Sequence, residues 1–308
     1  MKPILIDTPH CGLGDLIVNI WCLHSAKAAG IEAKLSPRNN LDLVRAFGVT
    51  PEDLSLDPGP RHYAKPRQRT GDWFQELRLT HGRTELSRFD AWCAFRGLGR
   101  LKPVRPPYCE HPSMGQWAQQ AWEWADGGSD SRRRVILFPH SSSFDRDWPK
   151  AYWIDLAHAL SKQGFHTLAL APGNASVRGF PSGINGQPVE RVLALIARAH
   201  AVIANDSGGA HFAGTIGRPT LAICGAAKGS VVFAHMSDVA EWVAVARSRV
   251  PCVGCHFSPE HGWRAACFEG CQALLRLAPD EVEERFLDFW KRRGPQAGKE
   301  AQWASGNG

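Results

Sequence analysis

The chain has 308 residues, 44% of them hydrophobic and 21% charged, which excludes a disordered polymer and indicates one or two folded domains. No apolar run reaches the roughly 18 residues of a membrane span and no signal peptide is apparent, so a cytoplasmic protein is expected. The net charge is +6, and residues 61–105 carry eleven basic and four acidic side chains. That stretch is either an ordinary solvated surface or a surface for an anionic partner.

The first part of the chain opens with a β-α-β pattern. Residues 3–8 are typical of a buried strand, apolar residues recur at helical spacing over 14–29, and 32–35 suggest a second strand. Residues 50–112 are rich in Pro, Arg and Trp and do not resolve into elements, and their role stays open. A helix is expected near 114–124.

The second part alternates clearly between strands and helices. The strands are expected at 135–140, 166–173, 201–206 and 219–225, and the helices between them at 152–163, 189–199 and 208–217. This alternation predicts an α/β fold with a parallel sheet covered on both faces.

The composition divides the chain into segments. We expect an N-terminal domain over 1–126, a polar linker over 127–134 and a second domain over 135–278, followed by a helix over 279–294 and a disordered tail over 295–308.

Ligands bind parallel α/β sheets at the carboxyl ends of the strands, so the turns that follow strands are the candidate sites. In the turn "NDSGGAH", Asp206 and Ser207 precede Gly208 and Gly209 at the start of a helix, whose free N–H groups suit a phosphate. The alternative is a structural N-cap made by Asp206 or Ser207.

Two more turns carry polar groups suited to a diphosphate. In "FPHSSSFDRDWPK", hydroxyls and cations could bind and neutralise a leaving diphosphate, or the loop could be a plain polar loop. Its candidate side chains are Ser141, Ser142, Ser143, Arg146 and Lys150. The strand over 166–173 ends in Pro-Gly, and Gly173 is a further donor-side candidate.

The N-terminal turn "CGLGDL" resembles half of a dinucleotide-binding loop. Ile17 occupies the place of the third glycine of G-x-G-x-x-G, and the carboxylate of Asp15 would repel a pyrophosphate. Asp15 is therefore either a charge that complements the helix dipole or a group that takes part in chemistry.

Four segments together resemble a known family. "GLGDLI", "FPHSSSFDRDWPKAYW", "ANDSGGAHFAGTIGRPTLAICG" and "VPCVGC…CFEGC" occur in the order found in the ADP-heptose:lipopolysaccharide heptosyltransferases of glycosyltransferase family 9 and their bacterial relatives. The resemblance covers the first thirty residues and most of 135–290, but not 50–112. It implies a GT-B fold, in which two Rossmann-like domains face a cleft and a C-terminal helix crosses back to the first domain.

The resemblance also implies a reaction and the roles of residues. Asp15 corresponds to the general base of an inverting transfer, with Gly12 and Gly14 on the acceptor side. Asp206, Ser207 and Gly208 would bind the donor diphosphate. His211 lies nearby. The family's lysine before the Trp-Pro pair is replaced by Arg146, with Lys150 as a second candidate. No catalytic metal is expected. The loop after 166–173 lacks the acidic residue that relatives often place for the ribose, so the donor nucleotide stays open.

The four-cysteine cluster consists of Cys252, Cys255, Cys267 and Cys271, spaced C-x2-C-x11-C-x3-C. Two close pairs separated by a short loop are typical of a tetrahedral thiolate site, which predicts structural zinc or iron. The alternative is a set of reduced, packed cysteines.

The sequence therefore favours a glycosyltransferase that uses a nucleotide sugar, with ADP-heptose as the favoured donor. The acceptor is expected to be an anionic glycan, a lipopolysaccharide core or a protein, and peripheral contact with the inner face of the inner membrane is compatible with the basic stretch. Nucleic acid is not the expected partner. The alternatives are a non-catalytic binding or assembly protein for a polyanion and a dinucleotide-dependent oxidoreductase, against which the missing third glycine counts.

Overall fold

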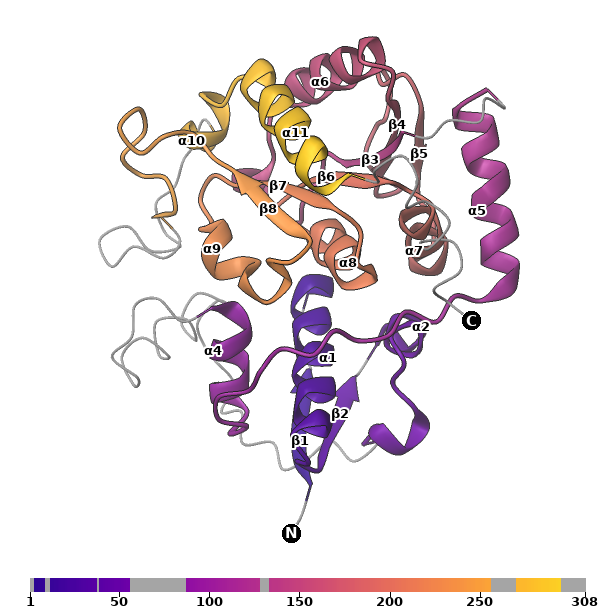
Figure 1. Ribbon diagram of the computed structural model, residues 1–308, viewed down its shortest axis with the longest axis vertical. Coiled ribbons are helices and arrows are strands. Elements are labelled where there is room, and N and C mark those ends of the chain that lie inside the picture. Colours follow the sequence, from indigo (N-terminus) through magenta and orange to yellow (C-terminus); the bar gives the residue numbers. More distant parts are fainter. Residues whose placement is uncertain are drawn as a thin grey trace.

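The protein is described here by a computed structural model. It describes residues 3–8, 12–37, 39–55, 87–127, 133–255 and 270–294. Figure 1 shows two lobes, with the N-terminal elements in one and the large sheet in the other. Within the described residues, no helix has the length and apolar character needed to cross a membrane.

The first lobe begins with the predicted β-α-β unit. Strand β1 (Ile4–Thr8) pairs in parallel with β2 (Ala33–Pro37), and α1 (Leu13–Ala28) connects them. The remaining described elements of this lobe were not predicted, and they are α2 (Leu41–Ala46), the short 3-10 helix η1 (Pro51–Asp53) and α4 (Arg88–Phe95).

The second lobe contains a parallel six-stranded sheet. Its strands are β3 (Arg134–Phe138), β4 (His166–Ala171), β5 (Gly183–Asn185), β6 (Ala201–Asn205), β7 (Thr220–Ile223) and β8 (Ala240–Val243). They lie in the order β5-β4-β3-β6-β7-β8, and every neighbouring pair is parallel. This is the strand order of a Rossmann fold. The predicted parallel sheet is confirmed, and the two edge strands β5 and β8 are additions to it.

Helices cover both faces of this sheet. One face packs on α7 (Val189–Ala197) and α8 (Gly208–Ile216), and the other on α6 (Lys150–Lys162) and α11 (Pro279–Arg293). Alternate residues of β3 divide between these two cores: Ile136 joins the first, whereas Val135 and Leu137 join the second. Burial on both faces explains why the central strands are almost continuously apolar.

Shorter helices complete the second lobe. They are the 3-10 helix η2 (Phe144–Arg146), α9 (Gly229–Val232), the 3-10 helix η3 (Ala234–Met236) and α10 (Gln272–Leu275). Helix α5 (Pro112–Ala125) was predicted near 114–124 as part of the first domain, but in space it packs beside α7 (Figure 1). The predicted domain limits stay a prediction.

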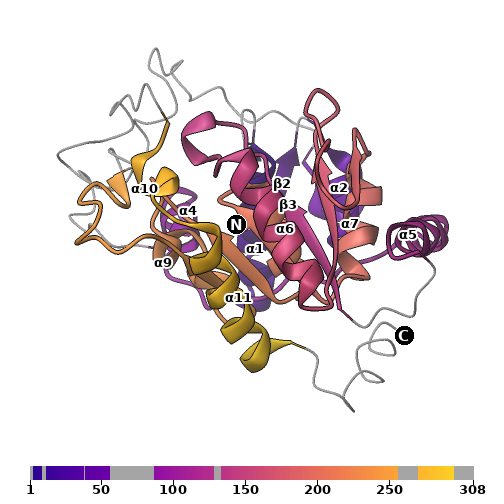
Figure 2. The ribbon, with the colours of Figure 1, turned by 90° about the horizontal axis from the view of Figure 1, so that it is seen from above.

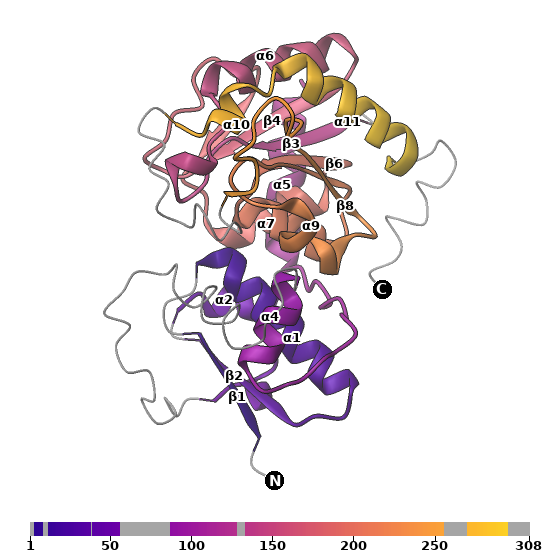
Figure 3. The same cartoon turned by 90° about the vertical axis from the view of Figure 1, so that its left-hand side faces the viewer.

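The C-terminal helix lies differently from the expectation. Instead of crossing back to the first lobe, α11 packs on α6 and β8 of the second lobe over its described length (Figure 3). The physical reason is its buried stripe, in which Val282, Phe286 and Phe289 enter the same core as α6. The predicted disordered tail lies outside the described residues, as do most residues of the linker.

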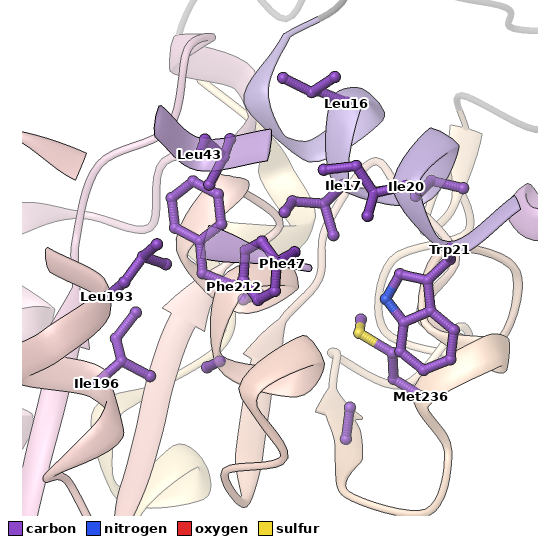
Figure 4. Close-up of a cluster of buried hydrophobic side chains, with 14 of the residues drawn as sticks. Leu16, Ile17, Ile20, Trp21, Leu43, Phe47, Leu193, Ile196, Phe212 and Met236 are labelled. Carbon is purple, nitrogen blue, oxygen red and sulfur yellow. The ribbon is translucent and has the colours of Figure 1, made fainter. Parts of the chain in front are cut away.

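The two lobes meet along α1 and α8. One hydrophobic core runs through both lobes, and Figure 4 shows Ile17, Ile20 and Trp21 of α1 near Phe212 of α8 and Met236 of η3. The indole Nε1 of Trp21 also donates a hydrogen bond to Oγ1 of Thr215, at 2.8 Å. The view from above shows α1 beneath the sheet (Figure 2). The N-terminal turn of α1 is therefore held beside the second lobe.

Candidate functional site

The sheet topology marks one position for a ligand. From β3 the chain adds β4 and β5 toward one edge of the sheet, and from β6 it adds β7 and β8 toward the other edge. The strand order therefore reverses between β3 and β6. Ligands of open α/β sheets bind outside the carboxyl ends of the strands at such a switch point. The two turns that leave it are the serine-rich loop after β3 and the Asn205–Gly209 turn after β6. Both were predicted as candidate turns from the sequence.

Hydrogen bonds join these two turns. The side chain of Asn205 is fully buried, and its Nδ2 donates to the carbonyl oxygen of Pro139 at 2.9 Å. Its Oδ1 accepts from the backbone N–H of Trp148 at 3.2 Å. Asp147 organises the serines, because its Oδ1 accepts from the N–H of Ser141 at 2.6 Å. The loop after β3 is therefore fixed against the end of β6.

Arg146 links the same two turns through its guanidinium. Nη2 donates to Oγ of Ser142 at 2.7 Å, and Nη1 donates to the backbone oxygen of Asp206 at 3.2 Å. The Asp206 carboxylate lies 3.7 Å from Nη1. The cation predicted to replace the family's lysine is thus placed at the switch point, beside the start of α8.

The start of α8 offers unpaired donors. Ser207 is its N-cap residue, but its side chain makes no capping bond, and Oγ is buried with no hydrogen-bond partner among the described residues. The structural N-cap interpretation therefore does not account for this hydroxyl. A Cβ on Gly209 would lie 2.4 Å from Cγ of Phe138, so only glycine fits there. A helix N-terminus with a free hydroxyl is suited to an anion.

The N-terminal turn of α1 contacts the start of α8 directly. A Cβ on Gly14 would lie 2.9 Å from Cδ2 of His211, and a Cβ on Gly208 would lie 3.4 Å from Cβ of Leu13. The glycines of "GLGD" and "DSGGAH" therefore let the two backbones approach each other. Two motifs separated by almost 200 residues form one site across the lobe boundary.

Asp15 lies in the first turn of α1, at this contact. Its Oδ1 accepts a hydrogen bond from Nη2 of Arg88 at 2.6 Å, and the two side chains are 25% and 15% exposed. The pairing partner is the first residue of α4, in a part of the sequence that showed no clear elements. The Asp15 carboxylate therefore lies at the start of a helix and also forms a largely buried ion pair with Arg88.

Three buried and stacked aromatic rings pack beside the contact between α1 and α8. The rings of His211 and His235 are stacked with centroids 6.1 Å apart, and Phe89 of α4 stacks on His235 at 6.0 Å. Neither ring nitrogen of either histidine has a partner within the described part of the chain. Burial, with Arg88 next in importance, lowers the pKa of His235 to about 3 and the pKa of His211 well below its usual value. Both imidazoles are therefore neutral at pH 7.

Other predicted site residues lie apart from this contact. Lys150 begins α6 and is exposed, and Gly173 lies in the turn after β4, where its neighbour is Gly186. Within the described residues, no hydrogen bond or ion pair joins either residue to the two turns at the switch point. Their donor-binding roles stay predictions.

The four-cysteine cluster is described only in part. Cys255 and Cys271 are buried in the core beneath α11, and Cys252 packs against that core, whereas Cys267 lies outside the described residues. Among the described residues, no group of three or more His, Cys, Asp or Glu side chains could hold a metal ion. The three described cysteines alone do not form a metal site, and the predicted structural metal stays a proposal that depends on Cys267.

Sequence reasoning missed three residues of the site. Asp147 was inside the serine-rich loop but was given no role, and His235 gave no signal. Arg88 was counted only as one of the eleven basic residues of 61–105, a set that was identified as a candidate surface for an anion. Only contacts across the fold reveal that this cation faces Asp15.

A family comparison matches the part of the chain that contains the switch point. Residues 110–258 match the model of glycosyltransferase family 9 (heptosyltransferase). A curated relative, lipopolysaccharide heptosyltransferase 1 of Pseudomonas aeruginosa, is 28% identical over 124 residues. That match covers 37% of this chain and 34% of the relative, about a third of its length.

Solved structures show the same fold over nearly the whole chain. The ADP-heptose lipopolysaccharide heptosyltransferase II of Escherichia coli has a TM-score of 0.62 at 14% identity, covering 94% of this chain and 99% of that one. The iron-containing dodecameric glycosyltransferase TibC of enterotoxigenic E. coli has a TM-score of 0.63 at 17% identity, with coverages of 94% and 78%. The resemblance predicted from the sequence motifs is confirmed.

Proposed function

We propose that the protein transfers a sugar from a nucleotide diphosphate donor to an acceptor hydroxyl, because residues 110–258 match the model of glycosyltransferase family 9 (heptosyltransferase). ADP-heptose is the favoured donor, and the acceptor is an anionic glycan, a lipopolysaccharide core or a protein. The observation that carries this proposal is the contact of Gly14 with His211, which joins the Asp15 turn to the start of α8.

The donor side is assigned to the second lobe. When the bond between the sugar and the diphosphate breaks, negative charge grows on the leaving phosphate oxygens. The free Ser207 hydroxyl, the N-terminus of α8 and the Arg146 guanidinium are preorganised groups that can stabilise that charge. Arg146 is held by its bonds to Ser142 and to the Asp206 backbone, so its position is set before the donor arrives.

The acceptor side is assigned to the first lobe. A single inverting displacement needs one base to take the proton of the acceptor hydroxyl as that oxygen attacks the anomeric carbon. Asp15 follows Gly14 at the α1–α8 contact, and it is partly open to solvent. We assign it the role of general base.

A binding and transfer experiment tests the proposed function. Purified protein is mixed with ADP-heptose, and with UDP- and GDP-sugars as controls, and unfolding is followed by heating. A donor at 100 times its Kd stabilises the folded state by about 2.7 kcal/mol, which raises the melting temperature measurably. ADP release is then measured with a heptose-free lipopolysaccharide core as acceptor.

The expected result is stabilisation by ADP-heptose and acceptor-dependent release of ADP. Stabilisation by no nucleotide sugar, together with salt-dependent binding to polyanions, would contradict the proposal and favour a non-catalytic binding protein.

A further inference from the structure

The ion pair between Arg88 and Asp15 joins two helices that pack side by side. Asp15 lies in the first turn of α1 and Arg88 begins α4. Further along the same two helices, Cys22 and Cys93 are fully buried with their sulfur atoms 3.4 Å apart. Because this seam is packed, the guanidinium is brought to the carboxylate by rigid elements and not by a loose loop.

The stability of α4 does not explain an arginine at position 88. A cation in the first turn of a helix opposes the helix dipole, at a cost of about 0.3–1 kcal/mol. The turn already has its favourable groups, since Oγ of Ser87 accepts from the N–H of Asp90 at 3.0 Å. Arg88 is thus placed where it disfavours its own helix and pairs with Asp15.

The same turn of α4 is fixed to the second lobe. Phe89 stacks on His235, which stacks in turn on His211 beside Gly14. Arg88 therefore keeps its place relative to both sides of the site. A group held in this way can orient a reacting carboxylate.

Resting on the proposed function, we propose that Arg88 is the positioning residue of the general base. Its hydrogen bond occupies Oδ1 of Asp15, and no described residue bonds to Oδ2. Oδ2 is then the oxygen that takes the acceptor proton. As it does so, the acceptor oxygen forms its bond to the anomeric carbon, and the bond from that carbon to the diphosphate breaks, with its electron pair leaving on the diphosphate.

This role predicts a specific kinetic signature. Arg88 donates to Asp15, and no hydrogen bond or ion pair within the described residues joins it to Ser207 or Arg146, so its loss is expected to misplace the base without weakening donor binding. A misplacement of about 1 Å can cost about a hundredfold in rate. An interaction made in the transition state lowers kcat when it is removed, whereas a binding contact raises KM.

The experiment compares Arg88→Ala and Arg88→Lys with Arg100→Ala, which removes an exposed cation of the same basic stretch. Steady-state ADP release from ADP-heptose and heptose-free core gives kcat and the donor KM for each. We expect Arg88→Ala to lose about ten- to a hundredfold in kcat with the donor KM nearly unchanged. Arg88→Lys should keep part of the wild-type kcat, and guanidinium added to Arg88→Ala should restore part of its kcat. Arg100→Ala should have the wild-type kcat and donor KM.

Several outcomes would overturn the inference. A wild-type kcat in Arg88→Ala, an equal loss in Arg100→Ala, or a raised donor KM at unchanged kcat would each exclude a positioning role. If Arg88→Ala does not fold, as judged by circular dichroism, Arg88→Lys decides alone through its kcat, and a wild-type value overturns the inference. Absence of transfer by the wild-type protein would instead overturn the proposed function, and this inference with it.

Discussion

The close approach of Gly14 to His211 makes one substitution especially informative. In Gly14→Ala, the new Cβ would lie 2.9 Å from Cδ2 of the His211 ring, closer than carbon atoms pack. The ring cannot easily yield, because it is 1% exposed and lies between His235 at 6.1 Å and Phe233 at 5.2 Å. The α1 turn that carries Asp15 must therefore move away from α8.

The magnitude follows from two opposing effects. Overpacking of a tight core typically costs about 1–3 kcal/mol. Alanine is a better helix former than glycine by up to about 1 kcal/mol, which offsets part of that cost. We expect Gly14→Ala to lose no more than about 2 kcal/mol of unfolding free energy, but to lose about tenfold or more in kcat, because the base is displaced.

Gly12→Ala is the matched control. Gly12 is the N-cap of α1 at a φ of −64°, and a Cβ there meets no atom within 4 Å. Alanine is the poorer N-cap, so this variant should lose about 0.5–1 kcal/mol with no displacement of the turn. The two variants thus have comparable stability losses and are expected to differ in turnover.

Urea unfolding and steady-state ADP release measure the two quantities. We expect kcat to fall much further in Gly14→Ala than in Gly12→Ala, because only the first new Cβ meets His211. Equal kcat values in the two variants would refute the inferred contact between the α1 turn and α8.

Three further predictions concern other parts of the molecule. Ser207→Ala should change the unfolding free energy by less than about 0.5 kcal/mol, because Oγ has no partner within the described chain. Calorimetry should find ADP binding weaker by about 1–2 kcal/mol. The hydrogen bond from Arg292 is the main cause that lowers the pKa of Glu241 in the folded protein. The ionised carboxylate therefore stabilises the fold at pH values above its unfolded pKa of about 4.3. That stabilisation is lost as the pH falls through the lower pKa of the folded state. Glu241→Gln should therefore cost about 1 kcal/mol at pH 7 and flatten the acid limb of a pH–stability curve; an unchanged limb would exclude the pairing as its cause. Metal analysis of untagged protein should find stoichiometric zinc or iron at the four-cysteine cluster, and its absence would favour reduced, packed cysteines.

Local patterns in the sequence predicted much of the fold. Each central strand is a short apolar run, and each helix between them has apolar residues at helical spacing, so the parallel sheet could be predicted. Strand β5 has three residues, none of them buried, and such a short segment has no readable period. The proline and the charges of 279–294 predicted the helix α11, but these local signals do not identify its packing partner. The crossing back to the first lobe, which the family resemblance implied, was wrong over the described helix.

The candidate site was predictable on one side only. The glycines and polar groups of "NDSGGAH" are adjacent in sequence, so a phosphate-binding turn could be predicted from the sequence alone. The partner of Asp15 is 73 residues away, at the start of a helix that follows a stretch with no periodicity. His235 acts through ring stacking that only the folded chain creates. Contacts of this kind depend on the packing of the two lobes, which local patterns do not determine.

The most direct test of the central claim is the turnover of Asp15→Asn with donor binding measured in the same preparation. The account predicts that kcat for transfer from ADP-heptose falls by about a hundredfold or more, the size of a general-base contribution, while the Kd for the donor stays close to the wild-type value. Near-normal turnover by Asp15→Asn, with its donor affinity intact, would contradict the assignment of Asp15 as the base and the one-site account built on it.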